Sequence, residues 1–530
     1  MRGFERGKRM VRTCGLIASV LALPKSVLAQ EARQGAATEP ENVQKADLAS
    51  VSALLQQLQS EVKELRGQVM SLKVQQEASK TDSAELHKEL EATKAQLIAF
   101  SSQLGKDAAP TNSPAPVPQT SIEDRVAGLE ENQQLADEKV AEQSQTKVES
   151  SSKYRLRLSG IVLLNTYVNR GAVDNQDFPQ IATPPAALSS NDAFGGSLRQ
   201  SQIGLQGFGP TVAGAHTSAE VRFDFAGGFP DAPNGTSFGI VRLRTGTVRF
   251  DWQDTSLIAG QDSLFLAPLS PTSIATLAIP AFGYSGNLWS WTPQVRIEHH
   301  FTLGENASVL LQGGLLDSLS GDRPASNYYR YPTVGENSGQ PAYATRLAWT
   351  ETVRGRKVTV GAGGYYGRQD WGYGRSIDGW AATADLTLPL GNRFEITGQF
   401  YRGRATGGLG GGIGQSVLWN GDLFDPATQL YGLNSIGGWA QLKYKATPKL
   451  QFNGAFGQDN PFAGDLRQFG GNRIYYPSPL SRNQSAMGNF LYQPKSDLIF
   501  SLEYRRLQTD TLDSKANVAN IITMSVGFLF

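Results

Sequence analysis

From residue 154 to residue 530, polar and apolar side chains alternate along the chain with a period of two. The clearest segment is 219–225, in which Glu220, Arg222 and Asp224 alternate with Ala, Val and Phe residues. In a β-strand these two sets of side chains lie on opposite faces of the sheet. A soluble, half-buried sheet would give the same pattern once, but here it returns in segments 295–301, 394–400, 450–456 and 500–505. The repetition predicts a large sheet with one wholly apolar face.

The alternating segments predict sixteen strands, with short and long connections between them in turn. Short connections include 209–213 and 252–254, and long ones include 263–290 and 405–434. Short turns at one rim and long loops at the other, with an even strand count, are typical of a transmembrane β-barrel. The expected strands are 154–168, 197–208, 215–226, 239–251, 255–262, 291–301, 308–317, 341–350, 357–367, 375–388, 393–404, 435–445, 449–458, 482–492, 498–507 and 517–530.

Aromatic side chains gather beside the short connections, as expected for a girdle at a membrane–water interface. The last strand also alternates apolar residues up to the terminal Phe530, a pattern like the assembly signal of bacterial outer-membrane barrels. We therefore expect an all-β transmembrane barrel of about sixteen antiparallel strands. The girdle residues are Phe208, Phe250, Trp252, Phe301, Trp349, Phe394, Tyr444, Tyr492 and Phe528.

The first 29 residues have the features of a secretory signal peptide. Five basic residues precede an apolar run at 14–24, and Ala29 supplies a small residue at the predicted cleavage site. The alternative, a membrane anchor, is disfavoured because the run is too short to span about 30 Å of hydrocarbon. The single cysteine, Cys14, lies within this peptide, so the mature chain has none for a disulfide or a Cys-based metal site.

The region between the signal peptide and the barrel is predicted to be a helical arm. Apolar residues keep a seven-residue repeat over 48–105, which indicates a self-associating coiled coil; an amphipathic helix packed on a globular core is the alternative. We expect a flexible segment at 30–47, a Pro-rich linker at 106–120 and a second short coiled-coil helix at 121–150. The barrel then covers 154–530.

Two short segments resemble strands of known proteins. Residues 199–207 (RQSQIGLQG) are similar to the second strand of sixteen-stranded bacterial porins, and Asn483–Ala486 with 492–494 is similar to their fourteenth. With its helical arm, the chain most resembles the trimeric porins of the DcaP type. This resemblance implies a homotrimer in the outer membrane, in contact with the lipid bilayer and lipopolysaccharide, with the arm in the periplasm. Peptidoglycan is a candidate partner of the coiled coil.

The polar face of such a barrel should line an aqueous lumen, because charge on the lipid face is costly. From Tyr154 onward there are 24 Arg and 6 Lys against 20 Asp and 7 Glu, a net of +3. Arginine binds carboxylates with two parallel donors, which favours anionic solutes. The alternative is that these arginines brace the wall by pairing with its carboxylates. The expected lumen residues are Glu220, Arg222, Asp224, Arg242, Arg244, Arg296, Glu298, Arg346, Arg402, Glu503 and Arg505.

Residues 263–295 contain no charged side chain, although 18% of the whole chain is charged. In sixteen-stranded porins the loop after the fifth strand folds inward and narrows the pore, and this segment has that position. The resemblance therefore implies a constriction loop that presents Ser270, Thr272, Ser273 and Thr276 instead of acidic groups. The alternative is that 264–281 only packs against the wall or a neighbouring subunit.

Other classes of function find little support. With His87 in the predicted coiled coil and His216, His299 and His300 as the remaining histidines, a Ser-His-acid enzyme is not expected, and neither is a metal or another cofactor. The net charge of +1 gives no indication of nucleic-acid binding. The glycine-rich run 407–414 does not match G-x-G-x-x-G, and we interpret it as a flexible external loop.

The sequence thus predicts an outer-membrane porin for passive diffusion of small polar solutes, with a preference for anions such as carboxylates. An envelope-spanning structural tether that links the outer membrane to the cell wall is the alternative. A tether would need a wall-binding module, and none is recognisable in residues 30–153.

Overall fold

The computed structural model describes residues 155–186, 190–229, 239–318, 320, 330–469, 479–513 and 516–530. The predicted signal peptide, flexible segment, coiled coil, Pro-rich linker and second helix lie outside the described residues.

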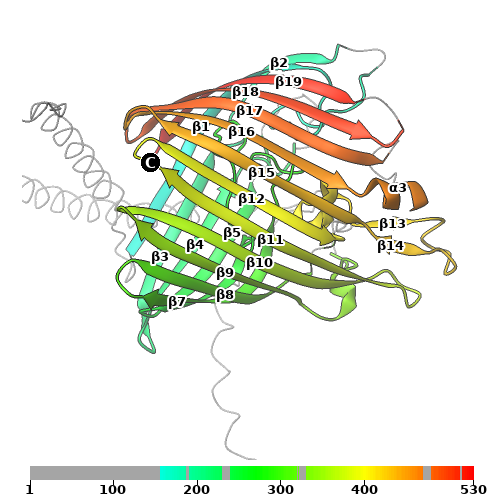
Figure 1. Ribbon diagram of the computed structural model, residues 1–530, viewed down its shortest axis with the longest axis horizontal. Helices are drawn as coiled ribbons and strands as arrows, with labels where there is room; N and C mark the ends of the chain where they lie inside the picture. Colours follow the sequence, from blue (N-terminus) through cyan, green and yellow to red (C-terminus); the bar gives the residue numbers. More distant parts are fainter. Residues whose placement is uncertain are drawn as a thin grey trace, which may run out of the picture. The chain divides into compact units, whose positions relative to one another are not determined.

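The described chain forms one closed antiparallel barrel (Figure 1). The barrel has sixteen strand positions, each of which we call a stave. Its first strand β1 (Arg155–Arg170) pairs with the last strand β19 (Asn517–Leu529) on one side. On its other side it pairs with β2 (Asp192–Ser197) and β3 (Gln202–Val212), which share one stave. The remaining staves follow in chain order: β4 (Ala215–Asp224), β5 (Arg242–Asp251), β6 (Thr255–Ser263), β7 (Trp291–Leu303), β8 (Ala307–Leu316), β9 (Ala342–Val353), β10 (Arg356–Asp370), β11 (Ser376–Leu390), β12 (Phe394–Arg404), β15 (Asn434–Lys445), β16 (Leu450–Pro461), β17 (Leu480–Lys495) and β18 (Leu498–Thr511).

The predicted sixteen-stranded barrel is confirmed, and two local differences are instructive. The second stave is interrupted at 198–201, so that β2 and β3 pair with different halves of β1. The long connections also contain elements that the alternation did not predict: the hairpin β13 (Val417–Trp419) and β14 (Leu430–Gly432), the helix α3 (Ala463–Phe469), and the 3-10 helices η1 (Glu336–Ser338), η2 (Gly407–Leu409) and η3 (Gly412–Gly414). These elements are too short for a period to show in the sequence.

The short connections fix the register of their hairpins. Between β9 and β10 the two turn residues Arg354 and Gly355 have φ of 50° and 74°, and Ala213 and Gly214 between β3 and β4 have 49° and 80°. Two successive positive φ values are the mark of the type I′ turn, whose twist matches that of the strands it joins. The polar and apolar faces of neighbouring strands are thereby kept in step.

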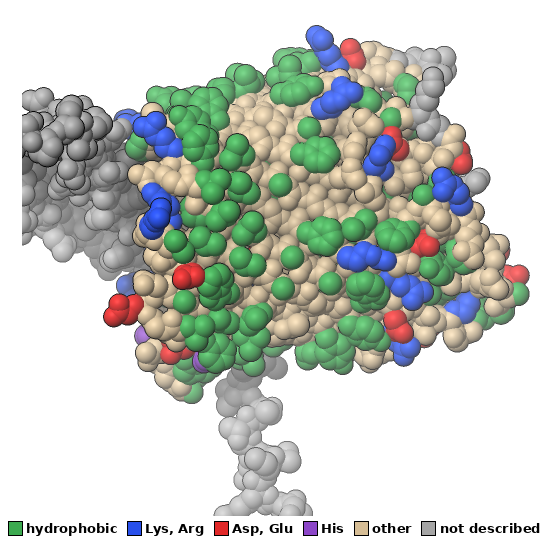
Figure 2. All heavy atoms as spheres, in the orientation of Figure 1, with side chains coloured by type: hydrophobic (Ala, Val, Ile, Leu, Met, Phe, Trp, Pro, Cys, Tyr) green, Lys and Arg blue, Asp and Glu red, His purple; other side chains and the backbone are tan. Residues whose placement is uncertain are grey.

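The two faces of the barrel differ as the alternation predicts. Outward side chains such as Ile297, Leu347 and Leu502 are exposed, whereas inward ones such as Arg296 and Glu503 are buried. Hydrophobic side chains are spread over the visible flank, and charged ones lie mostly toward the two ends of the barrel (Figure 2). Six of the nine predicted girdle residues are among the exposed large side chains: Trp252, Phe301, Trp349, Phe394, Tyr492 and Phe528. Among the described residues no helix is long and apolar enough to cross a membrane.

A buried ion pair spans three strands of the wall. Arg346 of β9 donates from Nε and Nη2 to both carboxylate oxygens of Asp385 on β11, at 2.9 and 2.8 Å. The pair passes over Gly361 of β10, where an added Cβ would lie 2.3 Å from Asp385 Oδ2 and 2.6 Å from Arg346 Nη2. Glycine at this position is therefore required for the ion pair to close.

Replacing Gly361 with alanine should destabilise the barrel, because the new methyl group would separate two buried charges. We expect Gly361→Ala to lower the free energy of unfolding by about 3 kcal/mol, the usual scale for breaking a buried pair. Gly454→Ala on β16 is the control, since its Cβ would meet nothing within 4 Å. Urea unfolding in detergent micelles measures both, and equal midpoints for the two variants would contradict this role of Gly361.

Candidate functional site

The charge-free segment between β6 and β7 lies inside the barrel. Its backbone oxygens accept hydrogen bonds from side chains on opposite walls: from Thr383 of β11 to Leu266 (2.7 Å), and from Arg242 of β5 to Ala278 (2.7 Å). A third bond joins Asn165 of β1 to Ala275 (3.3 Å). A segment held from three sides in this way crosses the lumen. We refer to residues 264–290 as the inner loop.

The start of the inner loop is packed by apolar contacts. Leu264, Phe265 and Leu266 form a buried cluster with inward side chains of β8 to β12, including Leu316 and Tyr401. Burying this much apolar surface fixes the loop against that wall. The expected alternative, packing against the wall, therefore holds for this part of the loop, and the lumen is filled there.

The four polar residues predicted for the constriction all make hydrogen bonds. Thr272 donates its N–H to Gln441 Oε1 (2.6 Å) and accepts at Oγ1 from Gln441 Nε2 (3.1 Å). Ser273 donates to Glu503 (2.6 Å), Thr276 accepts from Arg505 (3.3 Å), and Ser270 accepts from Asn287 within the loop (3.0 Å). These groups anchor the loop to β15 and β18, so less of their hydrogen-bonding capacity is left for a solute.

Two further loops narrow the lumen. In residues 171–186, Ala182 donates its N–H to Thr509 of β18 (2.9 Å), and Gln180 O accepts from Asn483 of β17 (3.0 Å). The glycine-rich run 407–414 is buried, and Gly412 donates its N–H to Tyr401 Oη (2.9 Å). Our interpretation of this run as an external loop was wrong, because its glycines allow the backbone to pack closely on the wall where side chains would not fit.

The side of the lumen formed by β3 to β7 holds a cavity. Its volume is about 350 Å³, and its lining is mostly polar. Three of the predicted lumen residues line this cavity: Glu220, Arg222 and Arg244. Arg249 and Asp262 line it as well. The sequence prediction omitted Arg249 and Asp262, although both occupy polar positions of predicted strands. Trp291, which forms one wall, carried no such signal.

Two arginines of this region, Arg242 and Arg244, share a single carboxylate, that of Asp224. Asp224 is fully buried and accepts two hydrogen bonds from Arg242, at 3.0 and 2.6 Å, while Arg244 Nη1 lies 3.7 Å from the same carboxylate. Both guanidinium groups also lie over the ring of Trp291, at 5.1 and 4.7 Å. Arg244 Nη1 donates no hydrogen bond within the described part of the chain. One carboxylate thus serves two cations, and it is hidden behind them.

Nearer the short turns two arginines pair with carboxylates, and the arginine side chain is the more exposed member of each pair. Arg222 pairs with Glu220, and its side chain is 53% exposed against 29% for the carboxylate. Arg249 pairs with Asp251 at 2.7 Å. The cavity therefore presents more guanidinium than carboxylate surface to a passing solute.

The other predicted lumen residues take two different positions. Arg296 pairs with Asp262 and Glu298 (both 2.8 Å), and Arg505 pairs with Glu503 (2.6 Å); like Arg346, they brace the inner wall. Arg402 is on the outward face of β12 with the exposed Phe400, since the intervening Tyr401 points inward and is buried. The lumen prediction for Arg402 is wrong, because outward charge is permitted near the strand end, beyond the apolar band.

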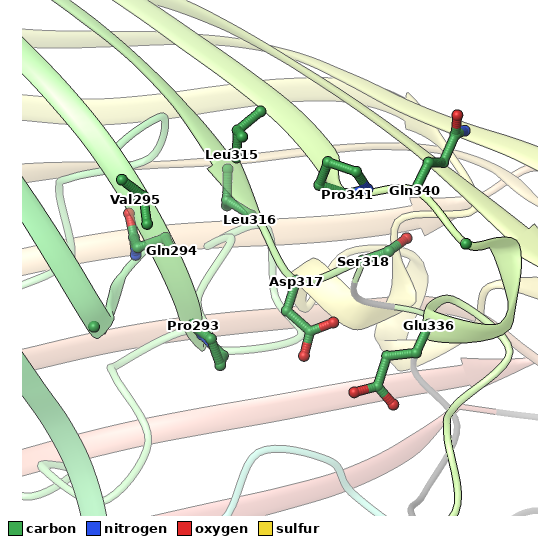
Figure 3. A pocket seen from close by; sticks show the side chains of 12 residues that line it. Pro293, Gln294, Val295, Leu315, Leu316, Asp317, Ser318, Glu336, Gln340 and Pro341 are labelled. Atoms are coloured by element: carbon green, nitrogen blue, oxygen red, sulfur yellow. The ribbon is translucent and has the colours of Figure 1, made fainter. Parts of the chain in front are cut away.

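A second hollow of about 540 Å³ lies at the long-loop ends of β7 to β9 (Figure 3). It bears the carboxylates of Asp317 and Glu336. Burial, with the nearby charge of Glu336, raises the pKa of Asp317, whereas the Arg330 guanidinium lowers the pKa of Glu336 to about 2. Outward residues such as Val295 line this hollow, so it is a surface groove and not part of the lumen cavity.

Comparison with known proteins bears on the fold. No family model matches the sequence, and no curated protein matches it. Among solved structures, the outer membrane channel DcaP of Acinetobacter baumannii has a TM-score of 0.54 and 17% identity, covering 73% of this chain and 100% of that chain. The chain has the porin fold.

Two other solved structures are less similar to this porin barrel. An anion-selective porin from Comamonas acidovorans has a TM-score of 0.45 and 10% identity, covering 71% of this chain and 100% of that chain. OprB of Pseudomonas putida has a TM-score of 0.41 and 10% identity, covering 71% and 94%.

Removing the polar anchors of the inner loop should loosen it. In Gln441→Ala/Asn489→Ala, Thr272 loses its three hydrogen bonds to the wall (2.6, 3.1 and 2.9 Å), while the apolar cluster still holds the start of the loop. We expect larger fluctuations of single-channel current in a planar bilayer. Gln508→Ala, on the outward face of β18, is the control, and an equally quiet channel in the double variant would contradict the anchoring role.

The loop 171–186 should respond to pH through Asp174. Its Oδ1 accepts the N–H groups of Gln180 (2.9 Å) and Ile181 (3.1 Å), and burial raises the pKa of this carboxyl to about 6. A raised pKa means that its stabilising contribution is complete below about pH 4 and is lost as the pH rises through 6. Asp174→Asn should remove this dependence, which hydrogen exchange of the loop amides, corrected for intrinsic rates, can measure. A pH dependence that persists unchanged in Asp174→Asn would contradict this assignment.

Proposed function

We propose that the protein is an outer-membrane porin through which small polar solutes diffuse passively. The observation that carries this proposal is the inner loop, which crosses the barrel yet leaves a polar cavity along β3 to β7. A barrel filled throughout by side chains would have no such space. The predicted homotrimer and periplasmic arm accompany this proposal as expectations from the family resemblance.

We further propose that the channel favours anions such as carboxylates. The support is the unequal exposure of its charges: Asp224 is buried behind Arg242 and Arg244, and Arg222 is more exposed than Glu220. Three guanidinium groups line the cavity, those of Arg222, Arg244 and Arg249, against two carboxylates, those of Glu220 and Asp262. Such an arrangement lowers the electrostatic barrier for anions and raises it for cations. The inner loop adds no acidic group to oppose this effect.

Removing a cavity arginine should shift ion selectivity toward cations. One unit charge about 6 Å from a permeating ion in water changes its energy by about 0.7 kcal/mol, or roughly threefold in permeability. We expect a threefold change of this kind for Arg222→Gln and for Arg244→Gln, which leaves Asp224 paired with Arg242. The measurement is the reversal potential of purified protein in a planar bilayer under a salt gradient.

Arg330→Gln is the matched control, because Arg330 pairs with Glu336 in the connection between β8 and β9, away from the cavity. Its reversal potential should equal that of the wild type. A wild-type protein that does not conduct would contradict the porin proposal. A conducting protein whose selectivity is the same in all three variants would contradict only the role of the arginines, which would then act as braces.

A further inference from the structure

Two arginines lie side by side on the outward face of β12, near its long-loop end. Arg402 lies over the rings of Phe462 and Trp380, at 4.4 and 5.5 Å, and Arg404 lies 5.2 Å from the ring of Tyr431. Stacking on aromatic rings holds a guanidinium in place while its edge stays free for hydrogen bonds. We refer to these five residues as the arginine patch.

The arginine patch lacks the carboxylates that accompany the inward arginines. Arg402 donates from Nη1 to Gly403 O and Ser435 O (3.1 Å) and from Nη2 to Asn434 Oδ1 (3.2 Å), and Arg404 donates from Nε to Gly432 O (3.2 Å); all these acceptors are uncharged. Neither forms an ion pair within the described ranges; the carboxylate of Asp465 accepts instead from the two amide groups of Asn434, both at 3.0 Å. The patch therefore carries two positive charges that the wall does not neutralise.

The height of the patch on the barrel fits a membrane interface. Phe394, an exposed girdle residue, precedes Arg402 on the same face of β12 by eight residues (402 minus 394). Eight residues of a strand tilted by about 40° rise about 20 Å, close to the roughly 25 Å height of the apolar band. The arginines thus lie at the interface opposite to the short turns, above apolar side chains such as Phe400.

We propose that the arginine patch binds the phosphate groups of a phosphorylated lipid in the outer leaflet, which in an outer membrane is lipopolysaccharide. Guanidinium groups bind phosphate oxygens through paired, charge-assisted hydrogen bonds. The apolar wall below the patch would contact the acyl chains of the same lipid, a contact that a free phosphate ion could not make. This inference rests on the proposed function for the identity of the outer leaflet.

The experiment uses the full chain in detergent, with bisphosphorylated lipid A as the probe and native mass spectrometry as the readout. Arg402→Gln/Arg404→Gln should bind lipid A at least tenfold more weakly than the wild type, and dephosphorylated lipid A should bind both proteins equally weakly. The matched control is Arg368→Gln/Arg482→Gln. It removes two outward arginines that already have carboxylate partners, Asp378 and Asp510, and should keep wild-type affinity.

Equal affinities of wild type and the patch variant for lipid A would overturn the inference, and so would displacement of lipid A by millimolar inorganic phosphate. Circular dichroism and heat-dependent gel mobility establish that each variant is folded. Planar-bilayer conductance separates this inference from the porin proposal, because the patch lies outside the lumen and its variant should conduct like the wild type. A wild type without conductance, but with lipid binding that the patch variant loses, would leave the inference standing and overturn the proposed function.

Discussion

The rest of the structure depends on the closure of the sheet. A strand edge in hydrocarbon would leave a row of backbone groups without hydrogen bonds, each at a cost of several kcal/mol. Pairing of β1 with β19 removes that edge. Because the closed sheet has lipid on one side, every second side chain within the apolar band must be apolar, and the charged residues at that depth are confined to the inside.

Confinement in turn determines how the inward charges are arranged. A charge enclosed by the wall and the inner loop is stable only with a partner, and Arg346 with Asp385 and Arg505 with Glu503 meet this condition at 2.8 and 2.6 Å. Formal charge inside such a barrel therefore stays near balance. Selectivity has to come from which member of each pair faces water, and at Asp224 the carboxylate is the hidden one.

The same constraints explain what could be read from the sequence. Strand positions followed from the period of two, and the inward course of 264–290 agrees with its lack of charge. Burial of 407–414 could not be foreseen, because it depends on the chain folding back after β12 so that Gly412 contacts Tyr401 of that same strand, and no sequence period marks such a return. The sequence also could not show that Asp224 lies behind two arginines, since its partners belong to another strand and their exposure depends on side-chain packing.

Arg402 shows where the alternation rule stops applying. The rule that a charged residue faces the lumen holds only within the apolar band, because only there does an outward charge meet hydrocarbon. Above the band the polar headgroups of the membrane are available as partners, and an outward arginine no longer needs a carboxylate from the wall. Inward arginines such as Arg296 and Arg346 have such carboxylates, whereas Arg402 and Arg404 have none among the described residues. The same residue type thus braces the wall on the inner face and is free to bind a ligand at the outer rim, and depth in the membrane separates these two roles.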